Sequence, residues 1–427
     1  MKHRQTVTAI LLLFLPSVFS FAQDTSQQSV QSAHPFVDRR EALMRSLGEG
    51  IAVLYSQGSR TETGYRADAN FWYLTGVDEP GAMLVLAPQQ AIRQILLLPP
   101  RDLDRERYTG RRPPLSESLR RTLGFDEVLR TTALDATILR CVKHATELHL
   151  ISNLAGPSAP VPPDLELYRD ITARVPEVTI KNSSHLLETM RAVKSAEEVA
   201  AIERAIQVTC QGITELLAEV RPGVTEYQLD GVLENSFKQQ GAQHMAFGPI
   251  VGAGEEATVL HYQTRYRTLE AGQLLLLDVG AEWDHYAADI SRTIPVDGRF
   301  TPEQAVVYDL VLRAQNAAIK HIRPGVTLKE IDDIARDIIC EAGYEFAHHI
   351  SHLVGLDVHD QDVLDLGLVL KPGMVITVEP GVYLPDQKLG VRIEDDVLVT
   401  ETGCRVLSDQ IPRERKDVET WMARAKR

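Results

Sequence analysis

The chain has 427 residues, of which 44% are hydrophobic and 24% charged. This is the composition of a globular protein, and it excludes disordered and fibrous classes. Its 59 acidic and 45 basic residues give a formal net charge of −14. The acid excess argues against a nucleic-acid-binding protein, which needs a basic face to contact phosphates. The length predicts two or three domains.

Residues 1–22 have the pattern of a secretory signal peptide. Lys2 and Arg4 precede an apolar run over residues 9–15, and the small residue Ala22 suits a cleavage site. The apolar run is too short to span a bilayer, although an uncleaved anchor is the alternative. We therefore expect a secreted or periplasmic protein without membrane contact after cleavage. Loss of the two basic residues lowers the net charge from −14 to −16.

Residues 23–188 are predicted to form an amino-terminal α/β domain, after a polar leader over residues 23–35. Three short apolar runs are each followed by turn residues, as is typical of strands; they cover residues 51–55, 82–86 and 94–98. The stretch 157–163 is rich in proline and predicts a loop. No isolated catalytic motif occurs in this domain.

Residues 189–427 are predicted to form a second domain that contains an internal duplication. A capping box at Ser195 begins a long helix, which is expected to continue through Leu217. The segment 220–225 recurs as 322–327, and each copy follows a predicted long helix. The threonine that ends each copy is expected to cap another helix. Arg-Pro-Gly-Val is also a common turn, but the matching context favours two related halves with a ligand cleft at their junction.

Two acidic residues are predicted to lie side by side on paired strands of this domain. Asp278 ends the apolar run 274–277, and Asp289 lies in a second strand candidate. If residues 282–284 form a turn, the two strands pair and both carboxylates face one point. A carboxylate in such a position is costly to bury unless it is paired or binds a cation.

Two further acids and a histidine extend this set. Glu379 follows another apolar strand, and Glu394 is expected to share a strand face with Arg392. His352 lies between these acids in the sequence. Four carboxylates in one cleft would repel each other strongly without cations, and two divalent ions would balance them. The oxygen-rich set with one imidazole suits Mn²⁺, with Co²⁺, Fe²⁺ or Zn²⁺ as alternatives, and it indicates metal-assisted hydrolysis.

Several common motifs are absent. His348 and His352 have the spacing of a zinc pair, but the H-E-x-x-H pattern is missing, and so is a G-x-S-x-G elbow. The four cysteines are far apart and form no C-x-x-C pair, so we expect buried free thiols; they are Cys141, Cys210, Cys340 and Cys404.

These residues make the sequence resemble the Xaa-Pro aminopeptidase (aminopeptidase P) and prolidase branch of the pita-bread metallopeptidases. The amino-terminal part carries Asn70 to Gly76 with Glu79-Pro80. The second domain carries the matching motifs in order, and these include 250–262, Asp278-Val279-Gly280, 289–293, Ser351-His352 to His359, Glu379-Pro380-Gly381 and 392–396. The resemblance implies an α+β fold, with a pita-bread catalytic domain of pseudo-twofold halves behind the α/β domain.

The resemblance also implies roles for individual residues. The implied ligands of two metal ions are Asp278, Asp289, His352, Glu379 and Glu394. Glu379 would also help to take a proton from the attacking hydroxide. The implied catalytic residues of the cleft wall are His261, His348, His359 and Arg392. Glu256 departs from the family pattern, which commonly has Asn at this position.

The expected function is that of a dinuclear metallo-aminopeptidase, which removes an amino-terminal residue that precedes proline. The expected substrates are peptides with proline at the second position, and no nucleic acid is expected as a partner. The resemblance further implies a homo-oligomer, a dimer or a tetramer. A dipeptide-specific prolidase, a metal-free creatinase-like hydrolase and a non-catalytic binding protein on the same fold are the alternatives.

Overall fold

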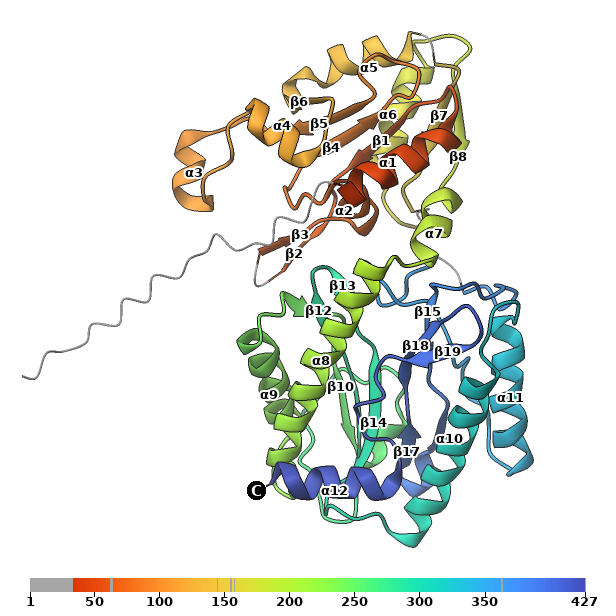
Figure 1. Ribbon diagram of the computed structural model, residues 1–427. Coiled ribbons are helices and arrows are strands. Elements are labelled where there is room, and N and C mark those ends of the chain that lie inside the picture. Colours follow the sequence, from red (N-terminus) through yellow and green to blue (C-terminus); the bar gives the residue numbers. More distant parts are fainter. Residues whose placement is uncertain are drawn as a thin grey trace, which may run out of the picture.

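The computed structural model describes residues 34–61, 64–143, 145–153, 156, 158–361 and 364–426. The chain forms an amino-terminal domain (red to yellow) and a second domain (green to blue), connected through α7 (His185–Ala192) (Figure 1). The predicted division between residues 188 and 189 falls inside this helix. The predicted signal peptide lies outside the described residues. Within the described ranges, no helix has both the length and the apolar character needed to cross a membrane.

The amino-terminal domain is built on one twisted sheet. Its predicted strands are confirmed as β1 (Ala52–Tyr55), β4 (Met83–Leu86) and β5 (Gln94–Leu98). The sheet order is β1-β4-β5-β6, with β6 (Glu127–Arg130) parallel to β5. Successive β4 side chains enter separate cores on opposite faces of the sheet, as the strand period of two requires.

The other helices and strands of this domain are α1 (His34–Leu47), β2 (Ser59–Thr61), β3 (Gly64–Arg66), α2 (Ala69–Thr75), α3 (Leu103–Thr109), α4 (Glu117–Leu123), α5 (Leu134–Val142), β7 (Glu147–Leu150), α6 (Pro163–Thr172) and β8 (Thr179–Asn182). They include the separate hairpin β2-β3 and helix α3, which projects away from the sheet (Figure 1). The predicted leader is wrong at its last two residues, because α1 begins at His34. Pro35 favours this start, since the first turn of a helix does not use its backbone N–H groups.

The second domain confirms the predicted duplication. Two long antiparallel helix pairs flank its strands (Figure 1), and they are α8 (Ala196–Glu219) with α9 (Glu226–Gln239) and α10 (Pro302–His321) with α11 (Leu328–Glu341). Every one of these helices begins with a complete capping box, in which the cap side chain and the third helical residue bond each other's backbone. The caps at Ser195, Thr225 and Thr327 are those that the sequence predicts.

The turn between the helices of each pair is the same in both halves. Gly223 donates its N–H to Leu269 O at 2.9 Å, and Gly325 donates to Leu370 O at 2.9 Å. Both glycines have positive φ angles, 91° and 89°. The turn therefore has a backbone conformation that glycine adopts readily. Each copy of the turn is hydrogen-bonded to a later segment of its own half.

Short sheets fill the space between the helix pairs. Their strands are β9 (His244–Met245), β10 (Ile250–Ala253), β11 (Leu274–Val279), β12 (Ala281–Trp283), β13 (Tyr286–Ala287), β14 (Ile290–Pro295), β15 (Val375–Val378), β16 (Gly381–Leu384), β17 (Leu389–Arg392), β18 (Asp395–Val399) and β19 (Cys404–Val406). The sheet orders are β10-β11-β14, β13-β12-β9, β15-β18-β19 and β16-β17. Helix α12 (Arg415–Ala425) closes the bottom of the domain in Figure 1.

Three local predictions for these strands need correction. Residues 282–284 were expected to form a turn, but Glu282 and Trp283 belong to β12, and the turn lies at Asp284 and His285. The hairpin β12-β13 is thus an excursion between β11 and β14, which pair with each other. The expectation that Asp289 lies within a strand is wrong for the same reason, because it falls between β13 and β14. The third correction concerns Glu394, because β17 ends at Arg392 and Glu394 lies in the connection to β18.

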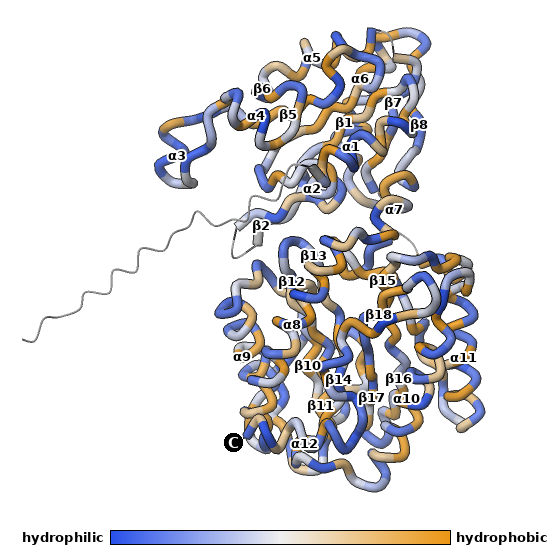
Figure 2. Tube along the Cα trace, in the orientation of Figure 1, coloured by the Kyte–Doolittle hydropathy of each residue, from blue (hydrophilic) through white to orange (hydrophobic). Residues whose placement is uncertain are grey.

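Hydrophobic residues run along the strands of both domains, whereas α3 is largely hydrophilic (Figure 2). One continuous apolar core includes residues of both domains, among them Phe71, Trp72, Ile206 and Tyr286. The four cysteines form no disulfide. Cys141 is buried as expected, whereas Cys210 and Cys404 are only half-buried and Cys340 is exposed, so the expectation of buried thiols is wrong for Cys340 and only partly met by the other two.

Candidate metal centre

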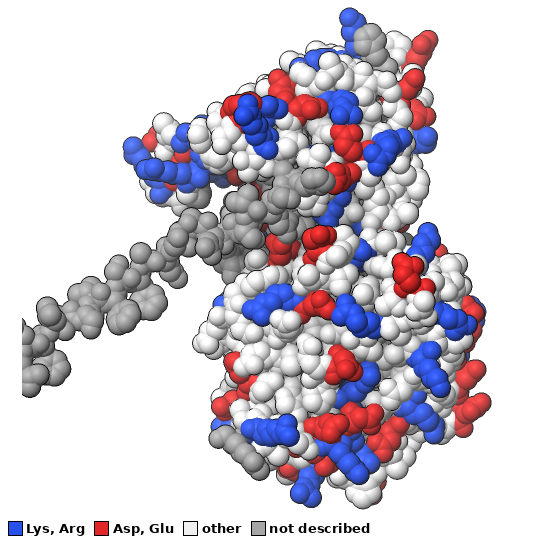
Figure 3. All heavy atoms as spheres, in the orientation of Figure 1, with Lys and Arg blue, Asp and Glu red and all other residues white. Residues whose placement is uncertain are grey.

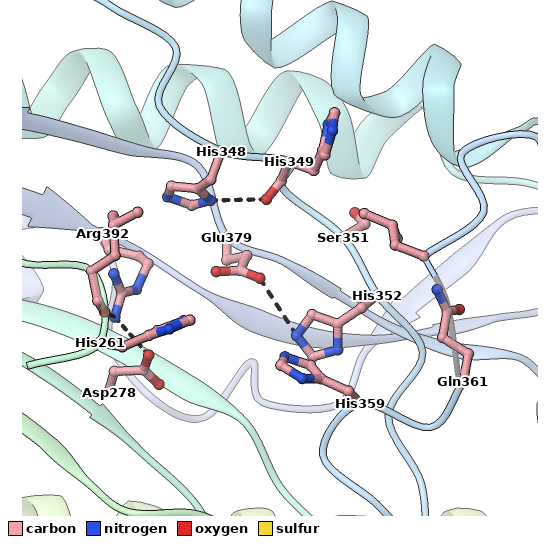
Figure 4. A pocket seen from close by; sticks show the side chains of 12 residues that line it. His261, Asp278, His348, His349, Ser351, His352, His359, Gln361, Glu379 and Arg392 are labelled. Atoms are coloured by element: carbon pink, nitrogen blue, oxygen red, sulfur yellow. Dashed lines mark hydrogen bonds and ion pairs between the residues drawn. The ribbon is translucent and has the colours of Figure 1, made fainter. Parts of the chain in front are cut away.

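A cavity of about 400 Å³ lies in the second domain, where its two halves meet. Figure 4 shows imidazole rings, carboxylates and one guanidinium directed into it. The lining residues are Leu260, His261, Asp278, His348, His349, Ser351, His352, His359, Gln361, Leu364, Glu379 and Arg392. Seven of the nine predicted site residues thus line the cavity, whereas Asp289 and Glu394 are not among its lining residues.

Asp278 and Asp289 reach this region from neighbouring strands. Strands β11 and β14 pair antiparallel, with Asp278 opposite Ser291 and Val279 opposite Ile290. Asp289 directly precedes β14, and its backbone N–H donates to Asp396 Oδ2 at 3.1 Å. Both aspartates are more than nine-tenths buried. The pairing of β11 with β14 thus brings two largely buried acids together, and Asp278 lines the cavity.

His352 and Glu379 are placed by a second strand and the segment beside it. Glu379 follows β15, and its N–H donates to Ile350 O at 2.9 Å, while Thr377 N donates to His352 O at 3.0 Å. These backbone hydrogen bonds hold the side chains of His352 and Glu379 on one side of the two paired segments. His352 Nε2 lies 3.5 Å from Glu379 Oε1 and 3.5 Å from Asp289 Oδ2 (Figure 4 draws the first contact).

Glu394 reaches the same point although it lies outside a strand. Its N–H donates to Ser291 O at 3.1 Å, and Arg292 Nη1 donates to Glu394 O at 2.5 Å. Ser291 Oγ then donates to Glu394 Oε2 at 2.9 Å. The buried Arg292 guanidinium also bonds Asp395 and the carbonyls of residues 411 and 412, so it fixes the connection that carries Glu394.

The donor atoms of this set fit a divalent cation. Atoms of Asp289, His352 and Glu394 that could bind a metal lie within 4.8 Å of one another. Arg392 Nη2 donates to Asp278 Oδ2 at 2.6 Å, whereas the buried Oδ1 of Asp278 has no hydrogen-bond partner among the described residues. A buried carboxylate oxygen without a donor needs a cation or a proton. All five ligands that the resemblance implies thus lie at one place.

Repulsion among the acids of this set contributes to their raised pKa values in the metal-free protein. Burial, and then the charges of Glu394 and Asp278, raise the pKa of Asp289 well above its usual value. The pKa of Glu394 is raised in the same way, and burial raises the pKa of Glu379 to about 8. Bound divalent cations would favour the charged forms and displace these protons.

Buried imidazoles in the centre are neutral at physiological pH. Burial lowers the pKa of His352 to about 3 and that of His348 to about 4. A neutral imidazole has a lone pair for a metal ion or a hydrogen bond. His261 and His359, by contrast, are exposed on the wall of the cavity, where a ligand can reach them.

Tyr383 is a member of the site that the sequence reasoning missed. Its hydroxyl accepts from Arg392 Nη1 at 2.9 Å and lies 2.8 Å from His348 Nε2. His348 Nδ1 lies 2.8 Å from the His349 carbonyl, so Nδ1 carries the proton and Nε2 accepts from Tyr383. A Cβ on Gly381 would lie 2.3 Å from this hydroxyl. The signal in the sequence is the spacing Gly381-x-Tyr383, which places both on one strand face behind Glu379.

Comparison with known proteins assigns the chain to a class. Residues 200–401 match Metallopeptidase family M24, and residues 36–150 match the Aminopeptidase P, N-terminal domain. The Xaa-Pro aminopeptidase of Escherichia coli (strain K12) is 32% identical, over 93% of this chain and 99% of that protein. The solved structure of Pseudomonas aeruginosa aminopeptidase PepP has a TM-score of 0.83 and 32% identity, covering 92% of this chain and 98% of that one. The Xaa-Pro dipeptidase of Pyrococcus furiosus is 39% identical, over 53% of this chain and 66% of that protein.

The fold and the buried carboxylate–histidine set together define a metallopeptidase. The chain belongs to metallopeptidase family M24, in the branch that carries the aminopeptidase P amino-terminal domain. The family, the pita-bread fold and the enzyme class expected from the sequence are thereby confirmed.

Proposed function

We propose that this metallopeptidase is an Xaa-Pro aminopeptidase, which hydrolyses the bond between an amino-terminal residue and a following proline. The observation that carries the proposal is the convergence of acids and histidines on one cavity, in a chain that aligns with an Xaa-Pro aminopeptidase over 93% of its length. Proline's tertiary amide has no N–H, so backbone pairing cannot recognise it. A site for such a bond depends instead on polarising the carbonyl and accommodating the ring.

We propose that two divalent ions, most suitably Mn²⁺, are held by the five implied ligands. These are Asp278, Asp289, His352, Glu379 and Glu394. Four carboxylates and one imidazole form an oxygen-rich set that suits Mn²⁺, with Co²⁺, Fe²⁺ and Zn²⁺ as alternatives. When bound, the ions would supply Lewis acidity at the scissile carbonyl and a nucleophile at neutral pH.

Proton transfer is assigned to Glu379. Its carboxylate lines the cavity, where a water or a substrate can reach it. A Glu379 oxygen would take the proton of the attacking water and later deliver it to the leaving proline nitrogen. Arg392, which pairs with Asp278 at 2.6 Å, would keep that carboxylate oriented.

His261, His348 and His359 are assigned to the substrate. His261 and His359 are exposed on the cavity wall, so their ring N–H groups can reach the peptide carbonyls. His348 differs, because both of its ring nitrogens are engaged, by the His349 carbonyl and by Tyr383. Nε2 is the acceptor in this arrangement, so it can accept a hydrogen bond from substrate only when it leaves Tyr383. We propose that Tyr383 holds the ring until substrate enters.

Three expectations about the whole chain belong to the same proposal. Residues 1–22 would direct export to the periplasm or the medium and then be removed. The mature chain would divide into an amino-terminal domain, residues 23–188, and a catalytic domain, residues 189–427. It would also assemble as a homo-oligomer, a dimer or a tetramer, in which the amino-terminal domain shapes the entrance to the cleft.

An Xaa-Pro dipeptidase is the second candidate, because the Pyrococcus furiosus Xaa-Pro dipeptidase is 39% identical over 53% of this chain. The two candidates are separated by substrate length. Purified protein reconstituted with Mn²⁺ is assayed on Xaa-Pro-Yaa tripeptides and on Xaa-Pro dipeptides. Cleavage of the tripeptides supports the aminopeptidase, whereas cleavage of dipeptides alone selects the dipeptidase.

A further inference from the structure

The loop from Leu353 to Asp360 carries His359 and closes on itself. Asp360 N donates to Leu353 O at 2.8 Å, and Gly355 N donates to Asp357 O at 3.1 Å. Asp357 N also donates to the Asp360 carboxylate, Oδ1, at 3.3 Å. The two ends of the loop are thus bonded together, and the orientation of His359 depends on the residue that follows it, Asp360.

Asp360 is the buried anchor of this loop, with 3% of its surface exposed. Arg191 Nη2 lies 2.5 Å from its Oδ1, and Lys194 Nζ lies 3.0 Å from its Oδ2. Burial alone would raise the pKa of Asp360, but the two cations outweigh burial and lower it. Asp360 is therefore an anion held between two buried cations, and removal of either cation leaves it less well compensated.

Both cations lie in the connection between the domains, at the end of α7 and directly after it. Arg191 donates in addition to Asn70 Oδ1 at 2.8 Å and to Asp357 Oδ2 at 2.7 Å. Asn70 belongs to α2 of the amino-terminal domain. A single guanidinium thus bonds the amino-terminal domain and both acids of the loop.

The space around Asp360 leaves the loop little freedom. A Cβ on Gly355 would lie 2.3 Å from Asp360 Oδ2, so the carboxylate is packed directly on the backbone at Gly355. On its other side the loop is bonded to the catalytic domain, because Ala287 N donates to Gly355 O at 2.8 Å. A shift of the Asp360 carboxylate must therefore move the loop backbone or His359.

We propose that Arg191 and Lys194 are positioning residues for His359, which they fix in the cavity by holding Asp360. The proposal rests on the proposed function only for the contact between His359 and the peptide. The interdomain connection is then part of the active-site architecture, and the amino-terminal domain supports catalysis through Asn70 and Arg191.

The experiment compares Arg191→Lys with a matched control. A lysine keeps the charge but cannot bond Asn70, Asp357 and Asp360 together, so His359 should lose its fixed orientation. We expect kcat/KM for an Xaa-Pro-Yaa tripeptide to fall about tenfold, as a misplaced contact group does. Arg39→Lys is the control, since Arg39 also crosses the domain interface, pairing with Glu198 at 3.2 Å, but has no hydrogen bond or ion pair with the loop.

A double-mutant cycle tests whether the effect passes through His359. In a His359→Ala background, Arg191→Lys should change kcat/KM by less than about twofold, because the group it positions is gone. A tenfold loss that persists in this background overturns the proposal. Lys194→Met is the second variant and keeps the Arg191–Asp360 pair, so it should give a smaller loss with the same dependence on His359.

A readout independent of activity is the imidazole NMR spectrum of histidine-labelled protein, in which His359→Ala assigns the signal of His359. Arg191→Lys should shift or broaden this signal, whereas Arg39→Lys should leave it in place. An unchanged His359 signal in both Arg191→Lys and Lys194→Met refutes the positioning role. If the wild type cleaves no Xaa-Pro peptide, the proposed function fails, yet the spectrum still decides the positioning proposal.

Discussion

At the scale of single residues, the centre combines acids that destabilise each other with groups that hold them in place. Arg392 pairs with Asp278, while Ser291 connects Arg392 Nε and Glu394 Oε2 through bonds of 2.9 Å each. One cation next to four acids leaves a negative excess. Burial and then this excess raise the pKa values of Asp289, Glu379 and Glu394, and metal ions would offset both effects.

Asp289→Ala should abolish peptidase activity while the chain stays folded. Asp289 lies within reach of both His352 and Glu394, so its removal takes away a ligand at the centre of the set. The backbone N–H that bonds Asp396 is kept in the variant, and one repelling charge is lost. The measurements are activity after Mn²⁺ addition, bound metal per chain and circular dichroism.

Asp309→Ala is the control for this substitution. Asp309 forms an exposed pair with Arg415 at 2.9 Å, and its loss should cost at most about 1 kcal/mol without affecting activity. Full activity of Asp289→Ala would refute the ligand assignment.

The metal-free chain should lose stability as the pH rises from 6.5 to 8. Glu379 has a pKa of about 8 in the folded chain against an ordinary value of 4.5. Between these values the folded chain binds a proton that the unfolded chain has released, and the stability that this proton provides is lost as the pH rises through 8. His348 and His352 have lowered pKa values and act oppositely, but only below their ordinary value of 6.5. Above pH 6.5 only the acids of the centre oppose each other in this way, and the share of Glu379 alone in the expected loss is up to about 2 kcal/mol.

Thermal unfolding in a chelator at pH 6.5 and pH 8 measures this effect. Glu379→Gln should show a smaller pH dependence, and added Mn²⁺ should raise the unfolding temperature more at pH 8 than at pH 6.5. A metal-free wild type whose unfolding temperature increases over this interval would contradict the assignment of the raised pKa values.

At the scale of elements, the duplicated helix pairs form a frame around the strands that carry the acids. The copies agree in their capping boxes and in the bonds of their turns, Gly223 to Leu269 and Gly325 to Leu370. The acids themselves are not duplicated in sequence. The two halves thus provide the same helical frame, but they place different candidate metal-binding residues at their junction.

Gly325→Ala should destabilise the chain by about 1 kcal/mol, because a φ of 89° strains any residue with a Cβ. No atom of the described residues lies within 4 Å of the Cβ position, so a clash cannot cause the effect. Gly231→Ala is the matched control: it has equal space but lies inside α9, where alanine should stabilise by about 0.5–1 kcal/mol. Chemical denaturation of both variants checks the opposite signs, and a neutral or stabilising Gly325→Ala would refute the strain argument.

At the scale of the whole molecule, the two domains are joined by a shared core and by buried polar contacts. The largest apolar core includes Trp72 of α2 and Tyr286 of β13, and Trp72 also stacks on His285 with ring centroids 4.4 Å apart. Arg66 of β3 bonds Glu282 of β12 at 2.6 Å. Such an interface resembles the interior of one domain more than a contact between independent ones.

The purified chain should therefore unfold in a single calorimetric transition. Separation of the domains would expose apolar surface and break the bonds of Arg191 to Asn70 and of Arg66 to Glu282, so neither domain should persist when the other melts. Scanning calorimetry measures this. Two transitions whose midpoint temperatures differ by more than the width of one transition would contradict the shared core. The variant Arg39→Lys tests whether the loss of a single ion pair at the interface is enough to divide the transition in two.

Charge is also a property of the whole molecule. Acidic and basic side chains are interspersed over both domains on the face in Figure 3. Four of the 59 acidic residues belong to the candidate centre, so most of the acid excess behind the net charge of −14 lies elsewhere on the chain.

Local features were predictable from the sequence because their causes are local. Capping boxes depend on residues three apart, which is why the starts of α8, α9 and α11 match the predictions. The apolar runs of β4 and β5 have the length and bounds of strands for the same reason. The turn at Asp284 and His285 was misplaced, because two non-glycine residues with positive φ carry no strong turn signal.

The sequence alone determined the residue types of the centre, the duplication and the positions of most strands. The reason is that the apolar pattern of a strand and the cap of a helix depend on residues that are close together in the chain. Only the tertiary structure decided which of these residues meet. Arg392 and Asp278 are 114 residues apart, and Arg191 and Asp360 are 169 apart. Such contacts depend on how strands pair and domains pack, and the burial produced by that packing turns ordinary acids into a site for cations.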